Sequence, residues 1–435
     1  MVMLHLSQYP RKKKFNVSHQ AHAEVSCHNS SVAQQLTPIL NSVSLGASHM
    51  SEYSAATRIN WLNTVFLLFT PILAIAGVIL HWNYFSAPGL TEFLVFIVFY
   101  FACGLSITVG YHRLFSHRSH EASSLLVLFY AIFGAGSFQN SILEWCSDHR
   151  NHHKSTDTDT DPYSVTRGFW YSHMGWVMIE EENFQNDFSN VKDLQSSKII
   201  MWQHRNIFLI GAMSGIILPA MVGFLFGGIA TGIGCLVWGG LVRTVFVHHG
   251  TFLINSAAHI WGTQPYSEEN SSKDSFWLAF LTFGEGYHNF HHTFQADYRN
   301  GHKWYHFDPS KWWIRIFTIL RLKSNLKKTP KHSIEVAKLD MKFKKTANKL
   351  NSKNIDTSIF EKQVMRYRKS MKLCLFEIHK ARQEMKEAMK NQAESIREKI
   401  IEIKQSYKQI KEDLKLMFNE MNEQYKAFPS KVMSL

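Results

Sequence analysis

Three groups of histidines recur along the chain at spacings that suit metal ligands. They read His112-Arg-Leu-Phe-Ser-His117, His149-Arg-Asn-His152-His153 and His288-Asn-Phe-His291-His292. A looser fourth element, Asn255-Ser-Ala-Ala-His259, lies between the second and third groups. Neutral imidazole is a good ligand for iron, copper, zinc and nickel. Because nine imidazoles are too many for one mononuclear site, the pattern predicts two metal ions.

Helical spacing predicts how these side chains group. Successive helical residues turn by about 100°, so the histidines of each H-x-x-H-H motif should share one face. Asn255 and His259 should share a face too. His112 and His117 diverge by about 140°, and we expect that they could serve different metals. A single pair of histidines would be weak evidence for a metal site. The prediction depends on all four histidine elements occurring in one chain.

Acidic residues beside these motifs suggest supporting roles. Di-iron proteins of soluble helical bundles use Glu and Glu-x-x-His ligands, whereas the motifs here are rich in imidazole. We therefore expect Asp148 and Glu285 to orient imidazole N–H groups. Three further acids, Asp157, Asp159 and Asp161, follow the second motif. They could do the same or act as helix N-caps, and we favour the caps.

Long apolar stretches precede the motifs. Crossing a bilayer takes about 20 apolar residues, and residues 61–82, 90–111, 207–226 and 229–247 qualify as four spans. A fifth run, residues 124–138, is short and favours a re-entrant or interfacial helix. Arg243 falls late in the fourth span, where we expect it to snorkel to the membrane boundary.

Charge predicts the orientation of these spans. The net charge of the chain is +13, but residues 321–435 hold 28 Lys and Arg against 14 Asp and Glu. The basic tail, Arg113, Arg150 and the N-terminal Arg11-Lys-Lys-Lys14 fall on one side of the predicted spans. The excess of basic residues on that side predicts a multi-pass protein with both termini and all histidine motifs cytosolic. The expected surroundings are a lipid bilayer, with no nucleic-acid partner.

The two ends of the chain differ from the middle. Residues 1–57 are polar and predict a disordered segment without a cleaved signal. Five scattered cysteines without a C-x-x-C pair argue against disulfides or a thiolate metal site. Residues 321–435 predict a basic tail, in which apolar residues from Met371 to Met421 recur at spacings of three and four. A coiled coil that forms a homo-oligomer and a helix that folds back on its own domain both fit this pattern.

At its histidine motifs the sequence resembles the membrane fatty acyl desaturases of the stearoyl-CoA (delta-9) type, over residues 58–320. The matching segments include Gly110-Tyr-His-Arg-Leu-Phe-Ser-His117, Ser137-Phe-Gln-Asn140, Asp148-His-Arg-Asn-His-His-Lys154, Asp159-Thr-Asp-Pro162, Asn255-Ser-Ala-Ala-His259 and Gly284-Glu-Gly-Tyr-His-Asn-Phe-His-His-Thr-Phe294. Residues 297–312 are similar to the bacterial and acyl-lipid branches of the family.

The resemblance implies an all-α integral membrane fold, with four transmembrane helices, a cytosolic helical di-iron cap and an added C-terminal coiled-coil-like helix. It implies an O2-dependent reaction that removes two hydrogens from a long saturated acyl chain and leaves a cis double bond, delta-9 in this type. Gln139, Trp145 and Thr251 match residues that shape the acyl tunnel in the family. The implied cofactor is two iron ions, held by His112, His117, His149, His152, His153, His259, His288, His291 and His292, with Asn255 acting through water.

Two departures leave the acyl carrier open. The animal acyl-CoA enzymes have basic residues where this chain has Ser147 and the run Glu180–Glu182, and acidic side chains there do not favour a phosphate-rich carrier. The substrate is therefore a fatty acyl-CoA or an acyl-lipid. The tail has no His-Pro-Gly-Gly motif, so electrons are expected from a separate ferredoxin or b-type cytochrome. The alternatives are a membrane di-iron hydroxylase and a non-catalytic membrane scaffold with a coiled-coil tail.

Overall fold

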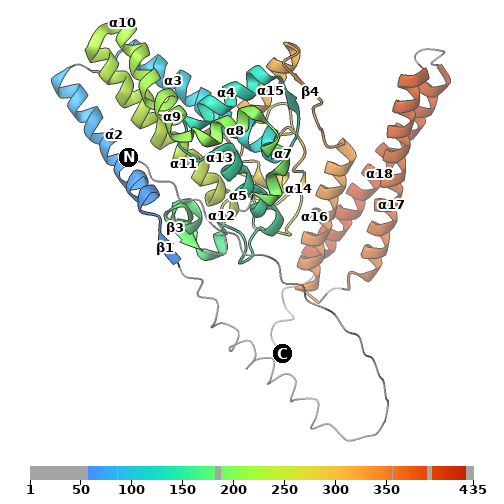
Figure 1. Cartoon of the computed structure of the whole chain (residues 1–435). Helices are drawn as coiled ribbons and strands as arrows, with labels where there is room; N and C mark the ends of the chain where they lie inside the picture. The colour runs from blue at the N-terminus through green and yellow to red at the C-terminus, as the bar shows by residue number, and fades with distance from the viewer. Residues whose placement is uncertain (1–56, 86, 182–187, 355, 389–393, 428–435) are drawn as a thin grey trace, which may run out of the picture. The chain divides into compact units, whose positions relative to one another are not determined.

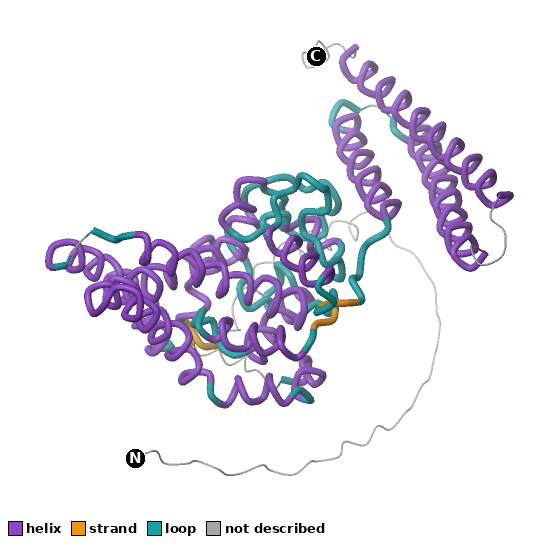
Figure 2. Tube along the Cα trace, turned by 90° about the horizontal axis from the view of Figure 1, so that it is seen from above, coloured by secondary structure: helices purple, strands orange, loops and turns teal. Residues whose placement is uncertain are grey.

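The computed structural model describes residues 57–85, 87–181, 188–354, 356–388 and 394–427. Helices predominate throughout these ranges (Figure 2). The predicted disordered segment, residues 1–57, lies outside the described residues except for Thr57. The fold is not purely α-helical, because two short antiparallel sheets are present: β1 (Thr57–Ile59) pairs with β3 (Ile179–Glu181), and β2 (Glu121–Ala122) pairs with β4 (Lys323–Ser324).

The helices follow one another along the chain as labelled in Figure 1. Up to the second histidine motif they are α2 (Trp61–Tyr84), α3 (Leu90–Leu105), the π-helix η2 (Ser106–Ser116), α4 (Ser124–Ala135) and α5 (Ile142–Ser155). Shorter helices follow: η3 (Val165–Arg167), η4 (Tyr171–Gly175), α6 (Trp176–Met178), η6 (Ser189–Val191), α7 (Lys192–Gln195) and α8 (Lys198–Arg205).

The second apolar region and the remaining motifs complete the order. The helices here are α9 (Ile207–Ala212), η7 (Met213–Ile217), α10 (Leu218–Cys235), η8 (Leu236–Val242), α11 (Arg243–Asn255) and α12 (Ala257–Ile260). After them come α13 (Phe276–Leu281), α14 (His288–Thr293), α15 (Pro309–Ile319), α16 (Lys331–Asn351), α17 (Ser358–Ala388) and α18 (Glu394–Ala427).

Three helices of the described chain are long and apolar enough to cross a membrane: Trp61–Tyr84, Leu90–Ser116 and Ile207–Ile260. Their outward side chains are large and apolar, such as Phe69, which is 54% exposed. Exposed apolar surface of this extent is unfavourable in water and is typical of a lipid-facing helix. The chain is therefore built to lie in a membrane.

The third of these helices is broken in the middle. It has 54 residues, and at about 1.5 Å per residue a straight helix of that length would far exceed a bilayer core of about 30 Å. The backbone leaves the helical region at Gly227 and Gly228, and Gly228 has a φ of 72° that favours glycine. The flanking arms approach each other closely, because a Cβ on Gly223 would lie 2.6 Å from the Cys235 side chain. This break lies between the two predicted spans 207–226 and 229–247. The prediction of four spans is nevertheless not confirmed, because both arms belong to one of the three candidate helices.

The short apolar helix α4 agrees with its prediction as too short to span. It packs against η2, where a Cβ on Gly110 would meet Tyr130 at 2.7 Å and a Cβ on Gly134 would meet Tyr111 at 2.3 Å. This close approach of two helices needs glycine at both places. It fixes η2, and therefore His112, against a core that also contains Ile142 of α5.

The prediction for Arg243 was wrong. Its side chain does not extend outward but is fully buried within the protein, with an exposed fraction of 0%. The guanidinium donates to the backbone oxygens of Gly136 at 2.6 Å, Gly215 at 2.6 Å and Gly239 at 3.0 Å. These three carbonyl groups satisfy the charge within the protein, and snorkelling is not needed.

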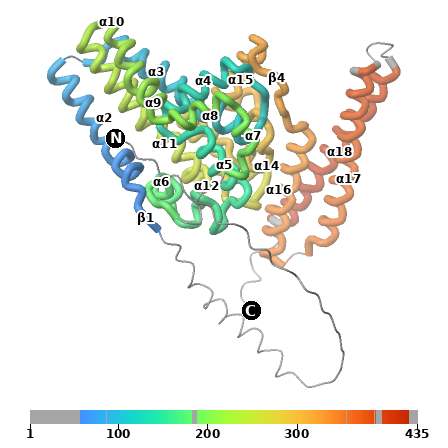
Figure 3. Tube along the Cα trace, viewed as in Figure 1, coloured from blue at the N-terminus to red at the C-terminus, as the bar shows by residue number. Residues whose placement is uncertain are grey.

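The tail folds back on itself. The single helix predicted from Met371 to Met421 is two helices, α17 and α18, and residues 389–393 between them lie outside the described residues. Val364, early in α17, packs with Met421, late in α18, so the two helices run antiparallel (Figure 3). The apolar positions of the predicted heptads are therefore largely buried within α16, α17 and α18. A coiled coil between chains is not needed to cover them.

Candidate metal centre

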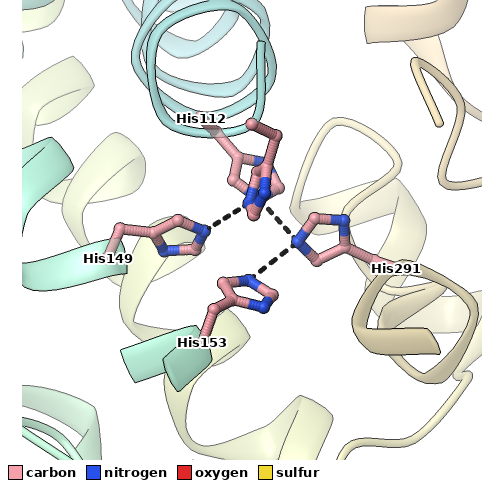
Figure 4. Close-up of side chains that lie close together, drawn as sticks. His112, His149, His153 and His291 are labelled. Atoms are coloured by element: carbon pink, nitrogen blue, oxygen red, sulfur yellow. Dashed lines mark hydrogen bonds between the residues drawn. The ribbon is translucent and has the colours of Figure 1, made fainter. Parts of the chain in front are cut away.

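The nine predicted histidines lie in two adjacent clusters. The first cluster has one ligand nitrogen from each of five residues, all within 4.8 Å of one another. Figure 4 shows four of them pointing toward a common centre from η2, α5 and α14. The members of the first cluster are His112, His117, His149, His153 and His291.

The second cluster has four histidines, all buried, and one ligand nitrogen from each lies within 4.8 Å of the others. Nε2 of His288 lies 3.1 Å from Nε2 of His259 and 3.1 Å from Nε2 of His292. The His153 and His292 rings stack at 4.2 Å where the two clusters adjoin. The members of the second cluster are His152, His259, His288 and His292.

Helical spacing explains how each H-x-x-H-H motif is divided. His149 and His153 are four residues apart, which is about 40° around a helix, and both enter the first cluster. His152 points about 100° from His153 and enters the second. The prediction that one motif serves one face was therefore too coarse. The suggestion that His112 and His117 serve different clusters was wrong, because η2 brings their ring centroids to 4.8 Å.

Four of the nine rings have a hydrogen-bond partner at Nδ1. Glu285 Oε2 lies 2.9 Å from His112 Nδ1, as predicted for that carboxylate. Asp161 Oδ1 lies 2.8 Å from His152 Nδ1, so the reading of Asp161 as a helix cap was wrong. An acceptor at Nδ1 keeps the proton there and leaves the Nε2 lone pair free for a metal.

Two partners were missed from the sequence because they are not acidic. Tyr163 Oη lies 3.1 Å from His149 Nδ1, and Ser271 Oγ lies 2.8 Å from His259 Nδ1. Ser271 is itself tied to Asp157, which accepts from its Oγ at 2.6 Å. Tyr163 follows directly after the Asp159-Thr-Asp-Pro162 segment, which is the one signal that could have pointed to it.

A buried charge network holds Glu285. Arg113 Nη2 donates to Glu285 at 2.7 Å and to Asp308 at 3.0 Å. The amide of Asn300 also donates to Glu285. Burial alone would raise the pKa of Glu285, but the adjacent Arg113 guanidinium holds it below its ordinary value. The carboxylate therefore stays ionised beside His112.

The donor set fits metal ions. Burial, followed by the neighbouring imidazoles, lowers the pKa values of His149, His153 and His292 well below that of a free imidazole, so these rings are neutral. Facing Nε2 atoms lie 2.8 to 3.1 Å apart in pairs such as His117 with His149 and His288 with His292. Imidazole nitrogens bind a metal ion at about 2.1 Å, and two ligands at right angles would then be about 3.0 Å apart. Two ions would satisfy lone pairs that otherwise face one another.

A cavity of about 430 Å³ adjoins the first cluster and includes His149 and Asn255 in its lining. Its volume is in the range of ligand sites. The three predicted tunnel residues, Gln139, Trp145 and Thr251, all line it. Gln139 Nε2 donates to Thr251 Oγ1 at 2.9 Å, and the Trp145 ring stacks on His149 at 4.9 Å. The cavity therefore brings the three predicted tunnel residues together beside a ring of the first cluster.

The sheet formed by β1 and β3 also contributes residues to the cavity lining, among them Arg58, Glu180 and Glu181. Glu181 accepts from Arg167 at 2.5 Å, and Glu180 accepts from Asn60 at 2.6 Å. Both carboxylates are thus occupied by neighbours, and Glu182 lies outside the described residues. Ser147 is buried and donates to Asn190 Oδ1 at 2.7 Å, and it is absent from the cavity lining.

Other histidines near the clusters have structural partners. His248 lies 2.7 Å from the backbone oxygen of Ser137, and His173 lies 3.1 Å from His249. Among the described residues, neither cluster includes any of these three. The four described cysteines are free, which confirms that none of them forms a disulfide.

A family model described as fatty acid desaturase matches residues 91–317, which hold all nine clustered histidines. The chain belongs to the fatty acid desaturase family. Family membership accounts for the repeated histidine motifs and for the apolar helices that precede them.

Several proteins named as desaturases are similar to this family member. A probable acyl-CoA desaturase of Schizosaccharomyces pombe is 42% identical over 66% of this chain and 58% of its own length. Acyl-CoA desaturase 1 of Saccharomyces cerevisiae is 40% identical over 67% of this chain and 56% of its own length. An sn-1 stearoyl-lipid 9-desaturase of Synechocystis is 35% identical over 61% of this chain and 80% of its own length. The chain thus spans less than two thirds of the length of the two yeast proteins.

Proposed function

We propose that this protein desaturates a long saturated fatty acyl chain in an O2-dependent reaction and introduces a cis double bond at the delta-9 position. The supporting observation is the cavity that passes from the β1–β3 sheet to His149 and Asn255, beside the first histidine cluster. An acyl chain in this cavity would present a methylene group to that cluster. The relatives named for acyl-CoA and for stearoyl-lipid desaturation agree with this proposal.

The proposed cofactor is iron, one ion in each histidine cluster. The five histidines of the first cluster and the four of the second would be the direct ligands, and Asn255 would act through water. When bound, reduced iron supplies the activation of O2. The chain contributes the ligand geometry: Glu285 and Asp161 each hold a proton at Nδ1 of a ligand ring, and Arg113 keeps Glu285 ionised.

The cavity wall would set which carbon reacts. The hydrogen bond between Gln139 and Thr251 joins two residues of the cavity lining, and Trp145, a third lining residue, stacks on His149 of the first cluster. A saturated chain has no polar group by which to register its position. Shape alone must therefore place two adjacent methylenes at the reactive position.

The acyl carrier remains a choice between two substrates, acyl-CoA and acyl-lipid. Glu180 and Glu181 lie at the cavity lining, but Arg58 lies beside them and Arg167 neutralises Glu181. The acidic run is thus a weaker obstacle to CoA phosphates than its sequence suggests. The purified protein, given stearoyl-CoA or stearoyl-phospholipid with a reducing system, would distinguish the two by product formation.

The proposed membrane arrangement has four crossings, with the arms on either side of Gly227 and Gly228 each crossing once. Both termini and the histidine clusters would be cytosolic, where a separate ferredoxin or b-type cytochrome would supply electrons. Self-association through the tail has lost its main support, because the apolar faces of α17 and α18 pack on each other. Exposed side chains such as Phe376 leave another contact open.

Expression in a desaturase-deficient host tests the proposal. Mass spectrometry of total fatty acids should detect a new delta-9 monoene in cells with a working electron donor. Hydroxy-acyl products in the same extracts would instead identify a hydroxylase. If no product forms and the purified protein contains no iron, the chain would be a scaffold and the proposal would be wrong.

A further inference from the structure

Arg243 is a buried cation in an apolar region of the fold. It begins α11, and its guanidinium donates to three backbone carbonyl groups, at the C-terminal end of α4, in η7 and in η8. None of the ion pairs found within the described ranges includes it. Burying a charge in such a place is costly unless its hydrogen bonds are satisfied, so this arrangement needs a reason.

One of these carbonyl groups belongs to the turn that forms the cavity wall. Gly136 closes α4, and Phe138, Gln139 and Asn140 follow it into the cavity lining. Phe138 and Asn140 have φ values of 54° and 68°. Non-glycine residues rarely adopt this left-handed conformation, and it persists only where the surroundings hold it. Gln139 lies between these two strained residues.

The carbonyl group of Gly215, the second acceptor of Arg243, belongs to a segment that packs directly against the same turn. Gly215 in η7 lies so close to the turn that an added Cβ would be 2.7 Å from the Phe138 ring and 2.8 Å from the Gly136 oxygen. Arg243 bonds both Gly136 and Gly215 at 2.6 Å. Its planar fork of donors joins the two backbone segments in a way that a lysine could not reproduce. His248 adds a contact at the Ser137 oxygen, 2.7 Å away.

We infer that Arg243 is a positioning residue, which holds the turn of residues 136–140 and thereby sets where an acyl chain bends in the cavity. The inference rests on the proposed desaturase function. Arg243 is absent from the cavity lining and from both histidine clusters. It acts through Gln139, whose side chain reaches Thr251 from this turn. Loss of the fork would relax the turn and shift the methylene that meets the first cluster.

The test compares Arg243→Lys and Arg243→Gln with the unchanged protein in the desaturase-deficient host. Double-bond position, chain length of the monoenes and iron per chain are measured together. A misplacement of about 1 Å can cost about 10²-fold in rate, so we expect the delta-9 monoene to fall about 10-fold. Monoenes of other position or chain length should rise as a share of product, with iron per chain unchanged. Arg205→Gln, at an exposed arginine on α8, is the matched control and should leave the products unchanged.

A second variant keeps the inference testable if the Arg243 variants do not accumulate. Gly215→Ala keeps the Arg243 side chain but pushes on Phe138 and on the Gly136 oxygen that Arg243 bonds, so it should shift the products in the same direction. The inference would be overturned if a variant that accumulates in the cells made monoenes with unchanged double-bond position and chain length. It would also be overturned if the iron content of the variant fell in proportion to its activity. Absence of monoene from the unchanged protein would instead refute the proposed function.

Discussion

Glu285 Oε2 lies 2.9 Å from Nδ1 of His112, and this contact joins the first histidine motif to a residue three positions before the third motif. The carboxylate is buried, and Arg113 and Asn300 occupy its remaining hydrogen-bonding capacity. The relationship couples a ligand ring to a charge network, so metal affinity and folding should respond together when the network is changed.

Glu285→Gln should lower both the iron content and the thermal stability. The amide cannot balance the buried Arg113 charge, and loss of such a supporting partner typically costs about 10- to 100-fold in metal affinity. Iron per chain by mass spectrometry and the Tm of the purified protein measure the two effects. Glu269→Gln, at an exposed carboxylate, should change neither. Full iron content in Glu285→Gln would show that the contact does not support the site.

Asp161→Asn should weaken the second cluster more than the first. Its carboxylate accepts from His152 Nδ1, and His152 belongs to the four-histidine cluster. Asn can still accept a hydrogen bond but carries no charge, so iron per chain should fall toward the share held by the first cluster. Asp159→Asn is the matched control, because Asp159 is exposed and two residues away. An equal loss from both clusters would contradict the division of the histidines described above.

Thr251→Val should alter product rather than iron. The change keeps the side-chain shape but removes the acceptor for the half-buried Gln139 amide, which then loses its hydrogen bond within the cavity lining. Gln139 should then move, and the ratio of monoene positions by mass spectrometry should change. Thr346→Val, on the exposed side of α16, removes a comparable hydroxyl far from the cavity lining and should have no effect. An unchanged ratio in Thr251→Val would show that this bond does not shape the cavity.

Lys323 should make stability depend on pH. Burial, followed by repulsion from Arg113, lowers the pKa of Lys323 from its ordinary value of 10.5 to about 6. Between those values the unfolded chain binds a proton that the folded chain does not, so stability rises with pH across this window. Lys323→Met removes this contribution, and its Tm should therefore rise less than that of the unchanged protein between pH 7 and 9.

Other groups near Lys323 do not change the direction of that prediction. His120 lies 3.1 Å away, and burial followed by the Lys323 charge lowers the pKa of His120 as well, so it titrates below the measured window. The Tyr130 ring lies under the amine at 5.0 Å. Lys327→Met, at an exposed lysine, should keep the original slope. Identical slopes for Lys323→Met and the unchanged protein would refute the buried neutral amine.

Removal of the tail should have effects that depend on where the chain is cut. Ile334 of α16 packs with Tyr266 and Phe290, and Phe290 is next to His291 on α14. Deletion of residues 331–435 should therefore reduce iron per chain, whereas deletion of residues 355–435 should spare most of it. Desaturation measured in the same cells should follow iron. Equal iron in both deletions would show that α16 does not support the metal-binding helix.

The sequence by itself determined the nine histidines and the apolar helices. These features are local: ligand motifs and hydrophobic runs can each be read without knowing what packs against them. The glycine pair at Gly227 and Gly228 could be read as a break for the same reason, because glycine tolerates a positive φ. Family resemblance added Gln139, Trp145 and Thr251 of the cavity wall, which no local rule would have chosen.

Only the tertiary structure decided how the histidines divide, which groups hold their Nδ1 atoms and what Arg243 contacts. His112 and His117 share a cluster because η2 turns differently from a regular helix, and Tyr163 and Ser271 reach their rings across loops. The tail helix folds back because α17 and α18 bury each other's apolar faces, a choice that a heptad pattern leaves open. Contacts between distant segments carry no periodic signal in the sequence, and their geometry is set only when the whole chain packs.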